Sequence, residues 1–64
     1  MKLNDIVSTK VEKEDIPVAS VGAIIGTKDD EQGNIKEFLV EIFTVPSHPH
    51  AQLFYLPKEL SKIQ

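Results

Sequence analysis

Residues 37–45, EFLVEIFTV, decide the fold that this sequence predicts. Phe38, Val40 and Ile42 recur at every second position, and the charged Glu41 stands between the last two. A period of two, in a stretch rich in β-branched and aromatic residues, indicates a β-strand with one buried face. We therefore predict a strand over residues 37–45, with the three alternating apolar residues in the core.

The segments around this strand predict four further strands and one helical turn. Residues 20–27, SVGAIIGT, are apolar and β-branched, and a glycine within such a strand indicates a bulge, a sharp bend or a close backbone approach. The charged segment 28–36 contains a Gly-Asn pair suited to a turn. The other predicted elements are strands over 4–9, 51–56 and 61–63, a helical turn over 57–60, a long, partly ordered loop over 9–20 and a proline-rich loop over 46–50.

These elements predict an all-β fold. A chain of 64 residues has room for one domain, so the domain should span residues 1–64. Five short strands can curl into a small, partly open barrel, because curling a sheet reduces its exposed edges. The predicted core consists of Val7, Val21, Ile24, Phe38, Val40, Ile42, Phe54, Leu60 and Ile63.

Four short motifs occur in an order that is typical of one group of proteins. They are Asp5-x-Val7, Val21-Gly22-Ala23-Ile24-Ile25, Phe38-x-Val40-Glu41-Ile42 and Pro57-x-x-Leu60-x-x-Ile63. This order resembles the small bacterial SH3-like barrel proteins, in particular a family of uncharacterised stand-alone domains. The small barrel subunit of photosystem I and the barrel of the nitrile hydratase β-subunit have a similar layout. The resemblance implies a five-stranded SH3-like barrel with a single helical turn before the last strand, and a module that binds through its surface. The chain departs from the family pattern at Ala19, where that pattern has glycine.

Composition argues against several functional classes. The chain has no cysteine, so neither a disulfide nor a thiolate ligand is available. The formal net charge is −3, and all seven cations are scattered lysines. Because arginine is the preferred residue for bidentate contact with phosphate and guanine, we predict no nucleic-acid partner. No run of about 18 apolar residues is present, so we predict no membrane span, and a cytoplasmic location is the expectation.

Leu39, Phe43 and Tyr55 are the predicted contact patch for a partner protein. In SH3-like domains, exposed aromatic residues can form a groove for a peptide. The same three side chains would equally well cover the end of the barrel. We predict a noncatalytic protein–protein interaction domain, an accessory or regulatory subunit. Self-association is a further possibility, because a domain of this size has a thin core.

An acidic cluster supports an alternative function. An immunity protein or antitoxin that masks a basic toxin gains association rate from negative charge. Acids on a turn are also ordinary solubilising charge, so the sequence supports either interpretation. The cluster consists of Asp29, Asp30 and Glu31.

His48 and His50 are weak candidates for metal binding. On an extended chain, residues i and i+2 share a face, so both rings could reach one ion. Structural zinc needs four ligands, however, and catalytic zinc usually three from the protein. Ser47 lies beside His48, but no nucleophile, base and orienting group are spaced for catalysis. We therefore predict no metal, no cofactor and no enzymatic activity.

Overall fold

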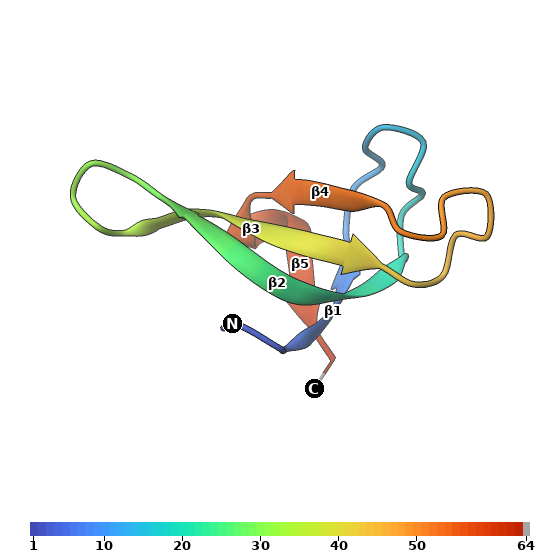
Figure 1. The fold of residues 1–64 in the computed structure, drawn as a ribbon, viewed down its shortest axis with the longest axis horizontal. Helices are drawn as coiled ribbons and strands as arrows, with labels where there is room; N and C mark the ends of the chain where they lie inside the picture. Colours follow the sequence, from blue (N-terminus) through green and yellow to red (C-terminus); the bar gives the residue numbers. More distant parts are fainter. Residues whose placement is uncertain (64) are drawn as a thin grey trace.

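A computed structural model describes residues 1–63 and contains one antiparallel sheet of five strands (Figure 1). The elements are β1 (Ile6–Thr9), β2 (Val21–Asp29), β3 (Ile35–Ile42), β4 (Gln52–Tyr55), the 3-10 turn η1 (Pro57–Glu59) and β5 (Leu60–Lys62). Their order across the sheet is β4-β3-β2-β1-β5. The prediction of an all-β fold with one helical turn before the last strand is confirmed. Within residues 1–63, β4 and β5 do not pair, so the sheet is open.

The hairpin of β2 and β3 is longer than the sequence pattern indicates. The two predicted strands end at residue 27 and begin at residue 37, whereas β2 continues to Asp29 and β3 begins at Ile35. The extra residues are exposed, so pairing continues where neither face is buried and no apolar alternation marks it. This part of the hairpin projects from the body of the protein (Figure 1).

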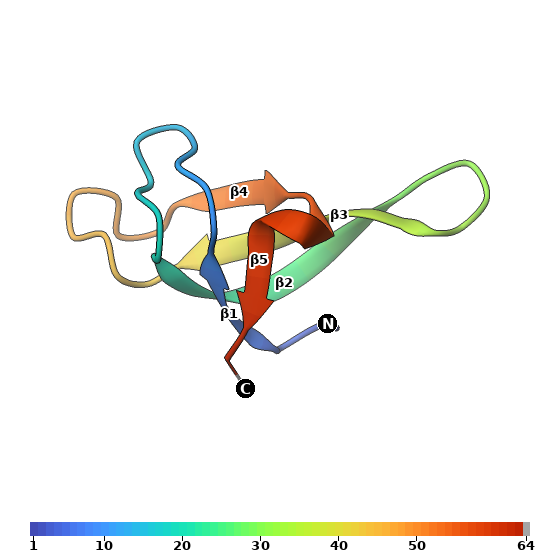
Figure 2. The same cartoon turned by 180° about the vertical axis from the view of Figure 1, so that it is seen from behind.

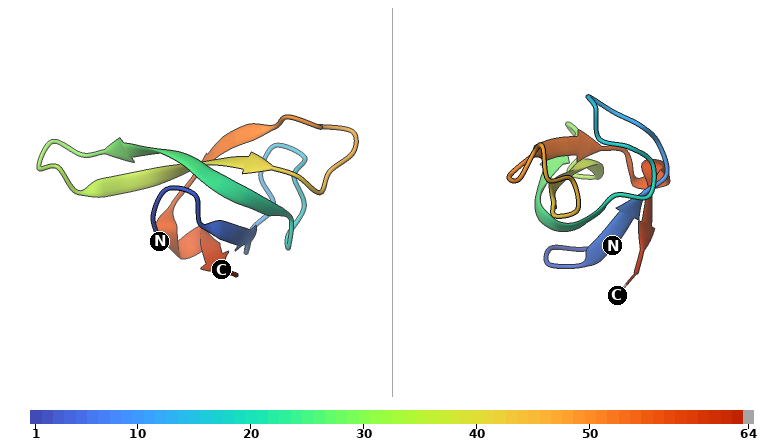
Figure 3. Two further views of the ribbon diagram at one scale, coloured as in Figure 1. Left: turned by 60° about the horizontal axis from the view of Figure 1, so that its bottom comes forward. Right: turned by 90° about the vertical axis from the view of Figure 1, so that its right-hand side faces the viewer.

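The sheet curls around its own inner face, as the end-on view in Figure 3 shows. The core residues on this face come from all five strands, and one more comes from the loop between β1 and β2. A sheet that curls in this way buries one side of every strand and leaves the other side outside. The buried core consists of Val7, Ile16, Ile24, Phe38, Val40, Ile42, Leu53, Tyr55 and Leu60.

Two residues of the predicted core are exposed, and a third is only partly buried. Ile63 was placed in the core together with Leu60, but residues three apart in an extended chain face opposite sides. Leu60, the first residue of β5 (Figure 2), is buried, and Ile63, one residue beyond that strand, is exposed. Phe54 is also exposed, because β4 turns Tyr55 inward instead. Val21 is half-buried.

Both glycines of β2 have a structural reason. Gly22 lies so close to β3 that an ideal Cβ atom would be 2.2 Å from the backbone oxygen of Glu41. The pairing of β2 with β3 then shifts between Ile24 and Gly26, which marks a β-bulge at Ile25. Of the three alternatives that the sequence leaves open for these glycines, Gly22 has the close backbone approach and Gly26 lies beside the bulge.

The loop of residues 10–20 is fastened at several points. Ile16 is buried in the core, and its backbone forms a bridge with Lys13. The Thr9 and Ser20 hydroxyls both donate to the Pro17 carbonyl, at 3.1 and 2.7 Å. The sequence predicts a partly ordered loop here, and the structure has it held to the sheet along its length.

Replacing Ala19 with glycine is expected to stabilise the protein. Ala19 has a φ of 67°, in the left-handed region that costs an L-residue roughly 1–2 kcal/mol and glycine little. Part of that gain is offset because glycine loses more backbone entropy on folding, which leaves about 0.5–1 kcal/mol. The measurement is the free energy of unfolding in urea. As a control, Ala23→Gly in the middle of β2 should lose about 0.5–1 kcal/mol. A variant at residue 19 that is no more stable than wild type would contradict the argument.

Candidate functional site

Three apolar side chains from three neighbouring strands lie on the outer face of the sheet. Leu39 of β3 pairs with Gly26 on one side and with Phe54 of β4 on the other. Ile25 lies at the bulge beside Gly26 and is 40% exposed, while Phe54 is 41% exposed and Leu39 is half-buried. We call Ile25, Leu39 and Phe54 the outer apolar row. It crosses the sheet from β2 to β4.

The bulge in β2 creates one end of this row. Ile24 is fully buried opposite Val40, and the next paired residue, Gly26, lies opposite Leu39. The extra residue, Ile25, therefore has no partner of its own on β3 and joins Gly26 on the outer side. An ideal Cβ on Gly26 would be 3.6 Å from the Leu39 Cβ atom, so Leu39 packs over the glycine.

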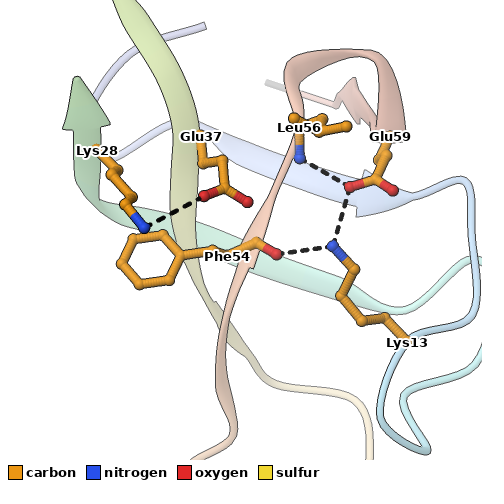
Figure 4. Close-up of polar contacts among 6 residues, drawn as sticks. All are labelled: Lys13, Lys28, Glu37, Phe54, Leu56 and Glu59. Atoms are coloured by element: carbon orange, nitrogen blue, oxygen red, sulfur yellow. Dashed lines mark hydrogen bonds and ion pairs between the residues drawn. The ribbon is translucent and has the colours of Figure 1, made fainter. Parts of the chain in front are cut away.

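Charged side chains border the row. The Lys28 ammonium lies 5.6 Å from the centre of the Phe54 ring, a cation–π distance, and 3.9 Å from a Glu37 carboxylate oxygen (Figure 4). Glu41 pairs with Gln52 of β4 on the other side of Leu39 along β3. Within residues 1–63, Glu41 has no ion pair.

A second polar cluster covers the free edge of β4. The Lys13 ammonium donates to the Phe54 carbonyl at 2.9 Å and to Glu59 at 3.1 Å (Figure 4). It also lies 4.8 Å from the centre of the Tyr55 ring. A loop that covers an edge strand, with a lysine bound to one of its carbonyl groups, discourages pairing with another strand. This cluster therefore joins the loop of residues 10–20 to β4 and η1 and shields the edge.

Glu59 is held in its charged form by this cluster. The hydrogen bond from the Leu56 N–H, 2.7 Å long, is the main reason that the pKa of Glu59 lies below its ordinary value of 4.5. Partial burial acts in the opposite direction, and Lys13 adds to the lowering. The charged Glu59 carboxylate therefore contacts both Leu56, directly before η1, and Lys13 in the loop of residues 10–20.

Replacing Glu59 with glutamine is expected to reduce stability in a pH-dependent way. Because folding lowers the pKa of Glu59, its contribution is fully present above the unfolded value of 4.5 and is lost as the pH falls through the folded value. The measurement is the free energy of unfolding of wild type and variant from neutral pH to about pH 3. The difference between them should be constant near neutrality and shrink below 4.5. Glu31→Gln on the exposed hairpin turn is the control and should show no such difference. A difference for Glu59 that persists in acid would contradict the assignment.

The structure corrects the predicted place of Tyr55. Its side chain is fully buried, so it cannot contribute to an exposed patch. Burial is the main reason that its pKa is raised, and Glu59 and Glu14 add to the effect. Leu53 and Tyr55 face inward on β4, whereas Phe54 faces outward. The signal that sequence reasoning missed is Gln52, a polar residue that shares the outer side with Phe54.

Phe43 and the acidic cluster lie away from Leu39. Phe43 is 54% exposed and follows the end of β3, four residues along from Leu39. The acidic residues are exposed at the far end of the hairpin, and the Asp30 carboxylate shapes its turn by accepting hydrogen bonds from the Gln32 and Asn34 N–H groups. Of the three predicted patch residues, only Leu39 belongs to the outer apolar row. The acidic cluster consists of Asp29, Asp30 and Glu31.

His48 and His50 lie in a loop of turns and not on a strand. The argument that an extended chain places both rings on one side therefore does not apply. His48 Nδ1 lies 2.9 Å from the Ser47 hydroxyl oxygen. Across residues 1–63 there is no group of three histidine, cysteine or carboxylate side chains arranged to hold a metal ion.

Comparisons with known proteins identify no relative. No family model, no curated protein and no solved structure matches the chain. In the part of the chain that the structure describes, there is no pocket and no helix with the length and apolar character to cross a membrane.

Proposed function

We propose that this protein is a noncatalytic protein-binding domain, an accessory or regulatory subunit, and that its surface for the partner is centred on the outer apolar row. The observation that carries the proposal is the row itself. Three apolar side chains from adjacent strands lie side by side on an outer face, and two of them are about two-fifths exposed. Contiguous exposed apolar side chains rimmed by charge are typical of protein interaction sites.

We propose further that the domain is a small SH3-like barrel. Support comes from the five antiparallel strands, the curl of the sheet around one core and the 3-10 turn η1 directly before β5. In this interpretation the core serves only to hold the sheet, and the surface performs the function.

A binding role also agrees with the titratable groups. Burial raises the pKa of Tyr55, and the hydrogen bond from the Leu56 N–H lowers the pKa of Glu59. Tyr55 packs in the core, and Glu59 fastens η1 to the loop. Each has a structural task, which favours an assignment of the protein as a noncatalytic subunit.

The experiment compares two matched pairs of substitutions. Ile25→Thr with Phe54→Thr removes apolar surface from the row and keeps a β-branched residue on each strand. Phe43→Thr with Ile63→Thr makes the same chemical changes at exposed positions outside the row. Each tagged protein is used to capture partners from native lysate, and a captured protein is purified and its affinity for all three forms measured. Circular dichroism establishes that both variants are folded.

We expect a stoichiometric partner that binds wild type and the Phe43/Ile63 variant and loses at least about tenfold in affinity for the Ile25/Phe54 variant. Equal affinity for the two variants, or loss only in the Phe43/Ile63 variant, would place the site elsewhere. Failure to capture any partner would contradict a stable complex.

A further inference from the structure

The net charge of the chain is carried entirely by one hairpin. Residues 21–42, which form β2, β3 and their turn, hold five carboxylates and two lysines, a formal charge of −3. All other residues together hold five carboxylates and five lysines, a formal charge of zero. The charged residues of the hairpin are Asp29, Asp30, Glu31, Glu37 and Glu41 with Lys28 and Lys36.

The same hairpin carries most of the outer apolar row. Ile25 belongs to β2 and Leu39 to β3, and the hairpin projects beyond the body of the protein (Figures 1 and 3). Along β3, Glu37 and Glu41 lie two residues to either side of Leu39. Alternate residues of a strand share a face, so both carboxylates border the row, about 13 Å apart. The apolar centre of the surface is thus flanked by two carboxylates, and one cation, Lys28, lies over the Phe54 ring beside Glu37.

These two carboxylates are poorly neutralised by the protein itself. Glu41 has no ion pair within residues 1–63, and the pair of Glu37 with Lys28 spans 3.9 Å on a largely exposed lysine. Exposed pairs of this kind contribute little, so the carboxylates keep their attraction for other cations. A partner that covers Leu39 must bring groups that face both of them.

We propose that the partner of the outer apolar row is a basic protein surface, in which apolar residues lie between lysine or arginine side chains. The inference rests on the proposed function and adds the chemistry of the partner. Apolar residues of the partner would cover Ile25, Leu39 and Phe54, and its cations would lie against Glu37 and Glu41. The further acids at the end of the hairpin steer such a partner during approach. An inhibitor that masks a basic toxin is one form of this pairing.

Charge also disfavours other occupants of the same surface. A second copy of the chain would bring two hairpins of charge −3 together, and like charges across an interface are unfavourable. Nucleic acids and anionic lipid surfaces carry negative charge and would be repelled by the same field.

The test uses three synthetic peptides of equal length. The first alternates lysine with leucine and phenylalanine, the second replaces the apolar residues with serine, and the third replaces lysine with glutamate. Binding to isotope-labelled protein is followed by NMR shifts at low and high salt. We expect the first peptide to shift the amides around Ile25, Leu39 and Phe54, with an affinity that falls about tenfold between roughly 50 and 300 mM salt. The second and third peptides should bind at least about tenfold more weakly.

Two charge variants show which carboxylates of the protein attract the first peptide. Glu37→Gln with Glu41→Gln should weaken the first peptide about tenfold. Glu12→Gln with Glu14→Gln removes the same charge from the neutral part of the chain and should change the affinity less than about twofold. Equal weakening by both variants would mean that only net charge matters and would overturn the proposal. So would equal binding of the serine peptide, no binding of the first peptide, or self-association of the protein that buries the row.

One result would contradict the basic character of the partner without contradicting the proposed function. A captured partner that requires Ile25 and Phe54, but whose affinity is insensitive to salt and to the Glu37/Glu41 variant, would leave the domain a binding module. It would overturn the basic character of the partner alone.

Discussion

Replacing Gly22 with alanine is expected to unfold most of the protein. The added Cβ atom would lie 2.2 Å from the Glu41 oxygen and 2.9 Å from a Val40 methyl group. The oxygen belongs to the backbone of the neighbouring strand, so neither strand can move without breaking their pairing. Overpacking against backbone costs about 3 kcal/mol or more, as much as the roughly 3 kcal/mol of total stability that about 0.05 kcal/mol per residue gives for a domain of this length.

Gly26 provides the matched control in the same strand. A Cβ atom there would meet the Leu39 side chain at 3.6 and 3.7 Å, which is ordinary van der Waals contact. We therefore expect Gly26→Ala to keep a dispersed NMR spectrum and a cooperative unfolding transition, and Gly22→Ala to lose both. A cooperatively folded Gly22 variant within about 1 kcal/mol of wild type would show that β2 can move away from β3.

Replacing Ile16 with alanine is expected to have the second largest effect. Ile16 is 1% exposed and is the one core residue that comes from the loop of residues 10–20. Truncating a buried isoleucine costs about 2–5 kcal/mol, because the lost transfer free energy adds to that of the cavity. The loop would also lose its anchor on the inner face of the sheet. The measurements are the free energy of unfolding in urea and amide hydrogen exchange across the loop.

Val18 is the control for this change, because it lies in the same loop and is exposed. Val18→Ala should change the free energy of unfolding by less than about 0.5 kcal/mol and leave hydrogen exchange in the loop unaltered. Similar effects of the two substitutions would mean that the loop contributes to stability through its backbone and not through Ile16.

The sequence predicts the buried residues of β3 because their alternation is unambiguous, although β3 covers Ile35–Ile42 and not the predicted residues 37–45. Buried and half-buried residues of that strand alternate with a period of two from Phe38 to Ile42. In β4, by contrast, the run of Leu53, Phe54 and Tyr55 has no polar residue to separate the faces. Gln52, directly before this run, is the one indication in the sequence that Phe54 faces outward, and the pairing of Phe54 with Leu39 fixes that side through the register between the strands.

The candidate site was predicted only in part, again because the pairing between strands decides which residues are exposed. Leu39 was identified from its position on the outer side of β3. Ile25 was not predicted, because its exposure results from the shift in register between β2 and β3. The pattern of one strand cannot show which of its residues will be left unpaired by another. The sequence also did not predict the residues of β2 and β3 nearest the turn, because exposed strand residues show no apolar alternation.

The end of the hairpin, residues 29–37, contributes nothing to the core, and this has a consequence for the evolution of the protein. No side chain beyond Lys28 on β2 or before Phe38 on β3 belongs to the buried core. At its tip, Gly33 has nothing within 4 Å of the Cβ atom that another residue would add, although its positive φ favours glycine. Solvated turns tolerate insertions and substitutions far better than packed segments. Mutations can therefore lengthen the hairpin or alter its charge to suit a new partner while the inner sheet stays the same.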